Sequence, residues 1–180
     1  MFSRLRANYR LSNILVRIAF VLAYVLYSWQ TCLMTTEMTI REMAFMGFSG
    51  FPESYTMLMS FFVSAGIGVG LMFLTPFVAK TFLNVSHFYS VPRAEFSLLA
   101  HVFITLYYLV CGVLRLINLL TPILLVWGEA LFPFLTSLGC VIWFYAVTSK
   151  LYFNDVTKPF YFRNMAIVYF VCTLVFGVVL

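Results

Sequence analysis

Residues 96–118 read FSLLAHVFITLYYLVCGVLRLIN, and Arg115 is the only Lys, Arg, Asp or Glu among them. A helix of about 20 apolar residues is long enough to cross the roughly 30 Å of hydrocarbon in a bilayer. This stretch therefore predicts a membrane-spanning helix, and runs of the same kind lie on both sides of it.

Four more apolar runs flank this helix, at residues 13–34, 55–82, 130–148 and 164–180. The short apolar segment 119–127 contains Pro122, and we interpret it as a re-entrant or interfacial turn before the fourth run. The pattern predicts an all-α fold, a polytopic transmembrane helical bundle of about five spans that forms a single domain over residues 1–180. Four spans is the alternative, with the last run lying at the interface.

The composition points to the same class of protein. Hydrophobic residues make up 63% of the 180 and charged residues 9%, whereas a soluble domain has about 45–50% and about 25%. Aromatic residues make up 19% of the chain, whereas disordered chains contain few of them. A soluble basic domain that binds nucleic acid is excluded, despite the net charge of +5.

The basic residues next to the spans predict the orientation, because Lys and Arg gather on the cytoplasmic side. Nine of the eleven fall on the side of the N-terminus, namely Arg4, Arg6, Arg10, Arg17, Lys80, Arg93, Lys150, Lys158 and Arg163. The opposite side holds Arg41 and Arg115 with four of the six acidic residues, Glu37, Glu42, Glu53 and Glu129. We expect a cytoplasmic N-terminus.

The first apolar run is longer than the core of a signal peptide, so we expect it to be retained as a span. The arginines beside it fit the rule that basic residues gather on the cytoplasmic side of a plasma membrane protein. Residues 1–17 also contain Arg and Ser and no acid, as mitochondrial targeting segments do. The plasma membrane is therefore the predicted location, and the mitochondrial inner membrane is the alternative.

A polar stripe runs along the third predicted span. His101, Thr105, Tyr108, Gly112 and Arg115 recur at steps of four and three, so at about 100° per residue they share one narrow face. Ionisable groups within a span usually face the bundle interior or a water-filled cavity. The stripe is thus a candidate path for a substrate or for protons.

A structural interpretation of the stripe competes with this one, and we favour it. The 14 residues from His101 to Arg115 span about 21 Å, so Arg115 could extend to one interface while His101 lies near the other. Glu129, just before the fourth span, is the candidate ion-pair partner of Arg115.

Small residues mark the second span as a packing helix. Gly66 and Gly70 form a GxxxG pair, and Ser60, Ser64 and Gly68 lie on a neighbouring face. Such residues let helix backbones approach closely in lipid. We expect this helix to be central and to pack within the chain, with a homodimer contact as the alternative.

The first loop, residues 35–54, is rich in Met and Phe with interleaved Glu. Such a segment suits a separate interfacial helix that ends near Gly47 and Gly50. A flexible Met-rich surface that binds a partner is the alternative.

Motifs for catalysis are absent from the sequence. There is no Gly-rich phosphate loop, nucleophile elbow or HExxH, and Asp155 is the only Asp. The four cysteines lie one in each of four spans without metal-ligand spacing. We expect no enzyme activity, no metal and no cofactor.

From Glu95 onward the order of features resembles the Yip (Ypt-interacting protein) family in its short bacterial form, over about half the chain. The resemblance rests on Phe96, Val102, Gly112, Leu116-Ile117-Asn118, Trp143-Phe144-Tyr145 and Lys150-Leu151-Tyr152. Asn118 stands where that family has Pro, and the family's Tyr and Pro within the third span are missing. The resemblance implies five spans, a cytoplasmic N-terminus and no catalytic residues.

The sequence therefore predicts a non-enzymatic multi-pass membrane protein, Yip-like, that acts through protein or lipid interactions in the bilayer. Its expected partners are bilayer lipids, other membrane subunits or a second copy, and not nucleic acid. The alternative is a small transporter or proton-conducting subunit of a larger complex that uses the stripe from His101 to Arg115.

Overall fold

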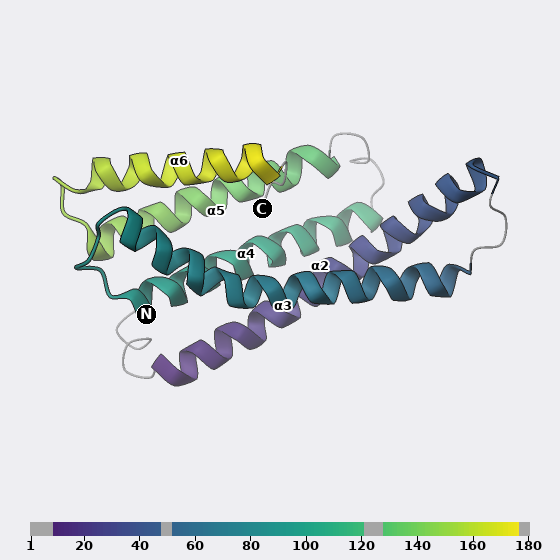
Figure 1. The fold of residues 1–180 in the computed structure, drawn as a ribbon, viewed down its shortest axis with the longest axis horizontal. Helices are drawn as coiled ribbons and strands as arrows, with labels where there is room; N and C mark the ends of the chain where they lie inside the picture. Colours follow the sequence, from purple (N-terminus) through teal and green to yellow (C-terminus); the bar gives the residue numbers. More distant parts are fainter. Residues whose placement is uncertain (1–8, 48–51, 121–127, 177–180) are drawn as a thin grey trace.

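The computed structural model describes residues 9–47, 52–120 and 128–176, and every regular element in these ranges is an α-helix. The helices are α2 (Tyr9–Phe45), α3 (Glu53–Val85), α4 (Arg93–Leu120), α5 (Gly128–Tyr152) and α6 (Lys158–Phe176). They run alternately up and down a single elongated bundle (Figure 1). Each of the five predicted apolar runs lies in or begins within one of these helices.

Four of the helices are long and apolar enough to cross a membrane. They cover Leu11–Phe45, Glu53–Val85, Arg93–Ile117 and Pro133–Tyr152. The fifth predicted span, 164–180, begins in α6, and its last four residues lie outside the described ranges. The predicted re-entrant turn also falls largely outside them, since α4 continues to Leu120 and the next described residue is Gly128.

The start of α2 and the α3–α4 and α5–α6 turns share one end of the bundle (Figure 1). The α5–α6 turn is closed by Asn154 and Thr157, whose backbone and side-chain groups bond to each other. Beside them Lys158 Nζ donates to Asp155 Oδ1 at 2.7 Å, and this hydrogen bond lowers the pKa of the Asp155 carboxyl.

The first loop is not the separate interfacial helix that we predicted. Instead α2 continues without a break through 37 residues, about 55 Å and so well beyond the hydrocarbon thickness. No Gly or Pro interrupts residues 34–45, so nothing in that stretch stops the helix. It ends just before Gly47, whose φ of 83° is left-handed, and this end was predicted correctly.

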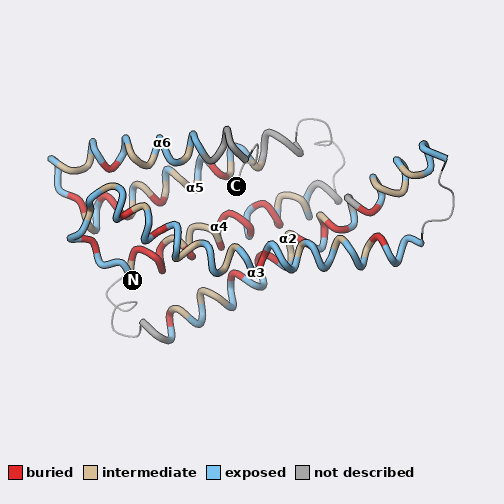
Figure 2. The backbone as a smooth tube through the Cα atoms, viewed as in Figure 1, coloured by how far each residue is buried: buried red, intermediate tan, exposed pale blue. Residues whose placement is uncertain are grey.

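The central helix is α4 and not α3, which corrects the prediction for the second span. Half of the most apolar stretch of α4 is buried, against 6% of that of α3, and Figure 2 shows the same contrast along the two tubes. The greater burial of α4 follows from its three neighbours, α2, α3 and α5. The polar stripe lies on the faces of α4 that these helices enclose. On α3 bulky apolar side chains point outward.

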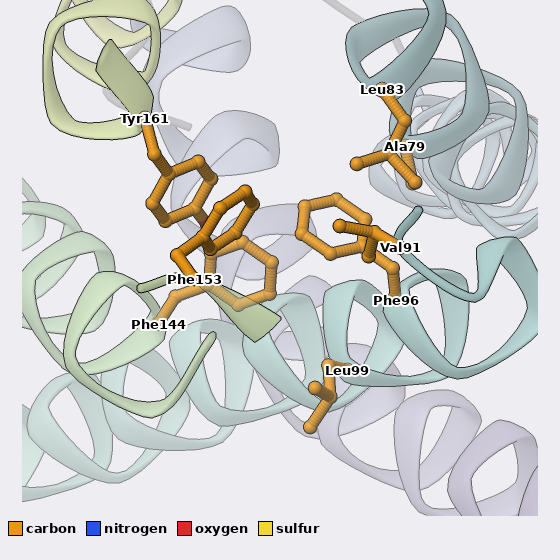
Figure 3. Close-up of a cluster of buried hydrophobic side chains, with 8 residues drawn as sticks. All are labelled: Ala79, Leu83, Val91, Phe96, Leu99, Phe144, Phe153 and Tyr161. Carbon is orange, nitrogen blue, oxygen red and sulfur yellow. The ribbon is translucent and has the colours of Figure 1, made fainter. Parts of the chain in front are cut away.

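Two clusters of buried side chains hold the helices together. The first joins α2 to α4 through Phe20, Ala23, Tyr24, Tyr107, Tyr108 and Cys111. The second joins α3, α4, α5 and α6 near the two turns, through Ala79, Leu83, Val91, Phe96, Leu99, Phe144, Phe153 and Tyr161 (Figure 3). Helices in lipid associate through such close packing, because apolar contact alone does not distinguish helix from lipid.

Candidate functional site

The α4 stripe faces the other helices along its whole length. His101, Thr105, Tyr108 and Gly112 are buried, and Arg115 is half-buried. The sequence predicted one shared face for these five residues, and the structure brings them together on that face. Their partners, which the sequence did not indicate, come from α2 and α3.

His101 is the most enclosed member of the stripe, with 2% of its surface exposed. Its Nδ1 lies 3.0 Å from the Ser97 carbonyl oxygen of its own helix. Its Nε2 lies 3.2 Å from the carbonyl oxygen of Met72 on α3. The imidazole is therefore buried between α4 and α3, with one ring nitrogen within hydrogen-bond distance of a carbonyl oxygen on each helix.

Thr105 and Tyr108 continue the packed face by one and two turns. Thr105 donates its hydroxyl hydrogen to the His101 carbonyl oxygen at 2.7 Å. The Tyr108 ring makes edge contacts with Tyr24 and Tyr27 of α2, each with ring centroids 5.0 Å apart. Such edge-to-face pairs contribute about 1 kcal/mol each beyond their buried area. Tyr108 thus serves the α2–α4 contact, and the Thr105 hydroxyl bonds within α4.

Gly112 lets α2 approach α4 closely. A Cβ at this position would lie 3.2 Å from the Leu26 side chain and 3.4 Å from the Tyr27 backbone nitrogen. Because the second neighbour is backbone, a larger residue would push the helices apart. The glycine belongs to the packing and not to a ligand site.

Arg115 ends the stripe and is held by α2. One guanidinium nitrogen donates to the Thr31 hydroxyl, and the guanidinium carbon lies 4.3 Å from the centroid of the Tyr27 ring. A cation over an aromatic face is favourable by about 0.5–2 kcal/mol, more where water is excluded. Within the described residues Arg115 is therefore oriented by a hydroxyl and a ring. The Glu129 side chain lies outside the described set, so its pairing with Arg115 stays a prediction.

The Arg115–Thr31 contact is expected to show as a coupling in a double-mutant cycle. We expect R115Q and T31V each to lower the free energy of unfolding in detergent, and the double variant to cost about 1 kcal/mol less than their sum. R41Q is the matched control, because Arg41 lies at the same end of α2 and is exposed. Additive costs for R115Q and T31V would contradict the contact.

The predicted Arg115–Glu129 pair is tested by the same measurement with E129Q. If the carboxylate compensates the guanidinium, R115Q and E129Q are each damaging and the double variant is no worse than either. Simple additivity would show that the two charges act separately.

The small residues of α3 divide between two opposite faces. A Cβ on Gly68 would lie 2.5 Å from the Tyr24 ring of α2, whereas Gly66 and Gly70 have nothing within 4 Å. Ser64 belongs to the packed face, since its carbonyl oxygen accepts a hydrogen bond from the Tyr24 hydroxyl at 2.8 Å. Of the predicted packing residues, Ser64 and Gly68 contact α2, and the GxxxG pair packs against no other helix among the described residues.

Most of the partners that the sequence analysis missed lie on α2, and one, the Met72 carbonyl, lies on α3. Tyr24, Tyr27 and Thr31 are spaced at three and four residues, which places them on one helix face. That spacing was a usable signal, but within an apolar span it does not reveal which helix the face contacts.

Among the residues that the structure describes, no group of three or more His, Cys, Asp or Glu side chains could hold a metal ion. Cys32, Cys111 and Cys140 are free thiols in the helix contacts. No protein-family model, no curated protein and no solved structure matches the chain. The all-α fold with four helices long enough to span is compatible with a membrane protein, and the candidate site is the α2–α3–α4 contact built on the stripe.

Proposed function

We propose that the chain is a five-span, non-enzymatic integral membrane protein with a cytoplasmic N-terminus, which acts through protein or lipid interactions in the bilayer, as the Yip resemblance implies. One observation carries the proposal. The described side chains of the stripe make their hydrogen bonds and ring contacts inside the bundle: His101 and Arg115 contact α3 and α2, and Thr105 bonds within α4. Between the ends of the bundle, the side chains that the described helices expose are mostly apolar.

The exposed apolar surface is broad on α3. Its outward side chains, half or more exposed in most cases, are Phe61, Phe62, Val63, Ile67, Val69, Phe73, Leu74 and Phe77. A surface of this kind would be costly in water and suits lipid tails or another membrane helix. The proposal places it in the bilayer.

The charge distribution supports the orientation. Lys80, Arg93, Lys150, Lys158 and Arg163 lie at or near the two turns that share one end of the bundle. Basic residues favour the cytoplasmic side. With this end in the cytoplasm and α6 crossing the bilayer, the C-terminus lies on the far side.

Thiol accessibility separates this proposal from the transporter alternative. In a chain whose native cysteines are replaced by Ser, we expect T105C and Y108C to be protected from a membrane-impermeant maleimide in the folded protein. Both should react after denaturation in SDS, and V156C, in the exposed α5–α6 turn, should react throughout as the control. Reaction of folded T105C or Y108C would reveal a water-filled path and favour transport.

Interaction itself is tested by purification in mild detergent, followed by identification of the bound chains. The proposal predicts a partner that is recovered at a fixed ratio and that recovers this chain in return when the partner carries the tag. A chain that purifies alone and transports a solute after reconstitution would contradict it.

A further inference from the structure

The second half of α3 lacks one of the backbone hydrogen bonds of a regular helix. Pro76 lies inside the helix, and since proline has no N–H, the Met72 carbonyl four residues earlier lacks its usual donor. The helix nevertheless continues to Val85. It bends in its second half (Figure 1), as helices do at proline.

A side chain from another helix supplies the missing donor. The Nε2 atom of His101, on α4, lies 3.2 Å from the Met72 carbonyl oxygen that Pro76 leaves free. The other ring nitrogen lies 3.0 Å from the Ser97 carbonyl oxygen, which the regular α4 ladder already pairs with the backbone N–H of His101. We assign the imidazole proton to Nε2, because the Met72 carbonyl oxygen has no helical donor and the Ser97 carbonyl oxygen has one.

The surroundings make this bond matter more than a surface bond would. His101 is 2% exposed, and hydrocarbon offers no water to a carbonyl that loses its partner. At the same turn of α3 the Thr75 hydroxyl donates to the Leu71 carbonyl oxygen at 2.6 Å. This bond adds a side-chain donor to the helix one residue before the carbonyl that Pro76 leaves without one.

We propose that Pro76, Met72 and His101 form a latch: the α4 imidazole replaces the backbone N–H that proline removes and thereby fixes the bend of α3. Opening the bond frees the two halves of α3 to change their angle. The latch is a conformational device of the fold, and it stands or falls independently of the interaction role proposed above.

A double-mutant cycle in detergent tests the latch directly. H101L removes the donor, and we expect a fall in Tm of about 5 °C while Pro76 is present. P76A restores a backbone N–H to pair with Met72, so in that background H101L should cost less than half as much. Equal falls in both backgrounds would overturn the proposal.

Two further variants sharpen the cycle. H101Q can place an amide nitrogen near the position of Nε2 and should keep most of the wild-type Tm, whereas the shorter H101N should not. T105V is the matched control on α4, because the Thr105 hydroxyl bonds only to its own helix in the described structure, and its cost should be the same with and without P76A. If H101L gives no folded protein, H101N takes its place.

Distance measurements test the mechanical part of the proposal. Spin labels at Phe62 and Val85, both exposed and on opposite sides of Pro76, report the bend of α3 in a chain with Ser in place of the native cysteines. We expect one narrow distance distribution in the parent chain, a broader one with H101N, and a narrow one again with P76A and H101N together. A narrow, unshifted distribution in H101N would overturn the latch.

Discussion

Replacing Gly68 by Leu is expected to separate α2 from α3 and to lower the free energy of unfolding by about 3 kcal/mol, because overpacking of a close helix contact cannot relax locally. The Cβ alone would lie 2.5 Å from the Tyr24 ring. That ring is itself fixed by its hydroxyl bond to the Ser64 carbonyl oxygen and by Tyr108 behind it. Thermal unfolding in detergent measures the effect.

The matched controls for Gly68 are G66L and G70L, two residues away on the same helix. Nothing lies within 4 Å of a Cβ at either position, so we expect their Tm to stay within about 2 °C of the wild type. If G66L or G70L were as damaging as G68L, those glycines would face a contact that the single chain does not make, and the assignment of the packed face would be wrong.

The second large effect is expected at Tyr161, the residue that ties α6 to the bundle. It is 0% exposed, and its ring stacks on Phe153 with centroids 4.1 Å apart (Figure 3). Its hydroxyl lies 2.6 Å from the Thr148 hydroxyl of α5. Y161A should lower the free energy of unfolding by about 4 kcal/mol, because it leaves a large cavity.

The conservative variant Y161F divides that loss between ring and hydroxyl. It keeps the stacking and removes the bond to Thr148, so its expected cost is about 1 kcal/mol. F160A, at the neighbouring and half-exposed position, is the control and should cost well under 1 kcal/mol. A Y161A protein as stable as F160A would mean that α6 does not pack as described.

The helices themselves could be predicted from the sequence, because long apolar runs in this chain have few other outcomes. Their relative positions could not. Gly68 and the GxxxG pair differ by two residues, so they lie on opposite faces of one helix. Both faces carry small residues, and the packed face is the one with Gly68, because the Tyr24 ring of α2 lies against it.

The polar stripe shows the same limit at the candidate site. The spacing from His101 to Arg115 predicted a shared face, and the structure has it. The residues that this face contacts lie on other helices, and the sequence alone did not identify them. The Met72 carbonyl lacks a helical donor only because Pro76 follows it by four residues, and Thr31 is a partner of Arg115 only through the packing of α2 on α4.

The length of α2 illustrates a third reason why sequence and structure differ. Hydropathy falls after residue 34, which suggested the end of a span, but a helix does not end where the bilayer does. With no Gly or Pro before Gly47, the helix continues through the polar residues. Helix end and membrane boundary are set by different physics and need not coincide.

The central claim is that the two turns at the basic end of the bundle lie in the cytoplasm and the α2–α3 connection lies outside. Single cysteines at Met46, Tyr89 and Val156, all exposed, test it in intact cells with a membrane-impermeant thiol reagent and a chain that lacks its native cysteines. The account predicts that M46C is labelled in intact cells, and that Y89C and V156C are labelled only after permeabilisation. Labelling of all three from the same side, or the reverse pattern, would contradict it.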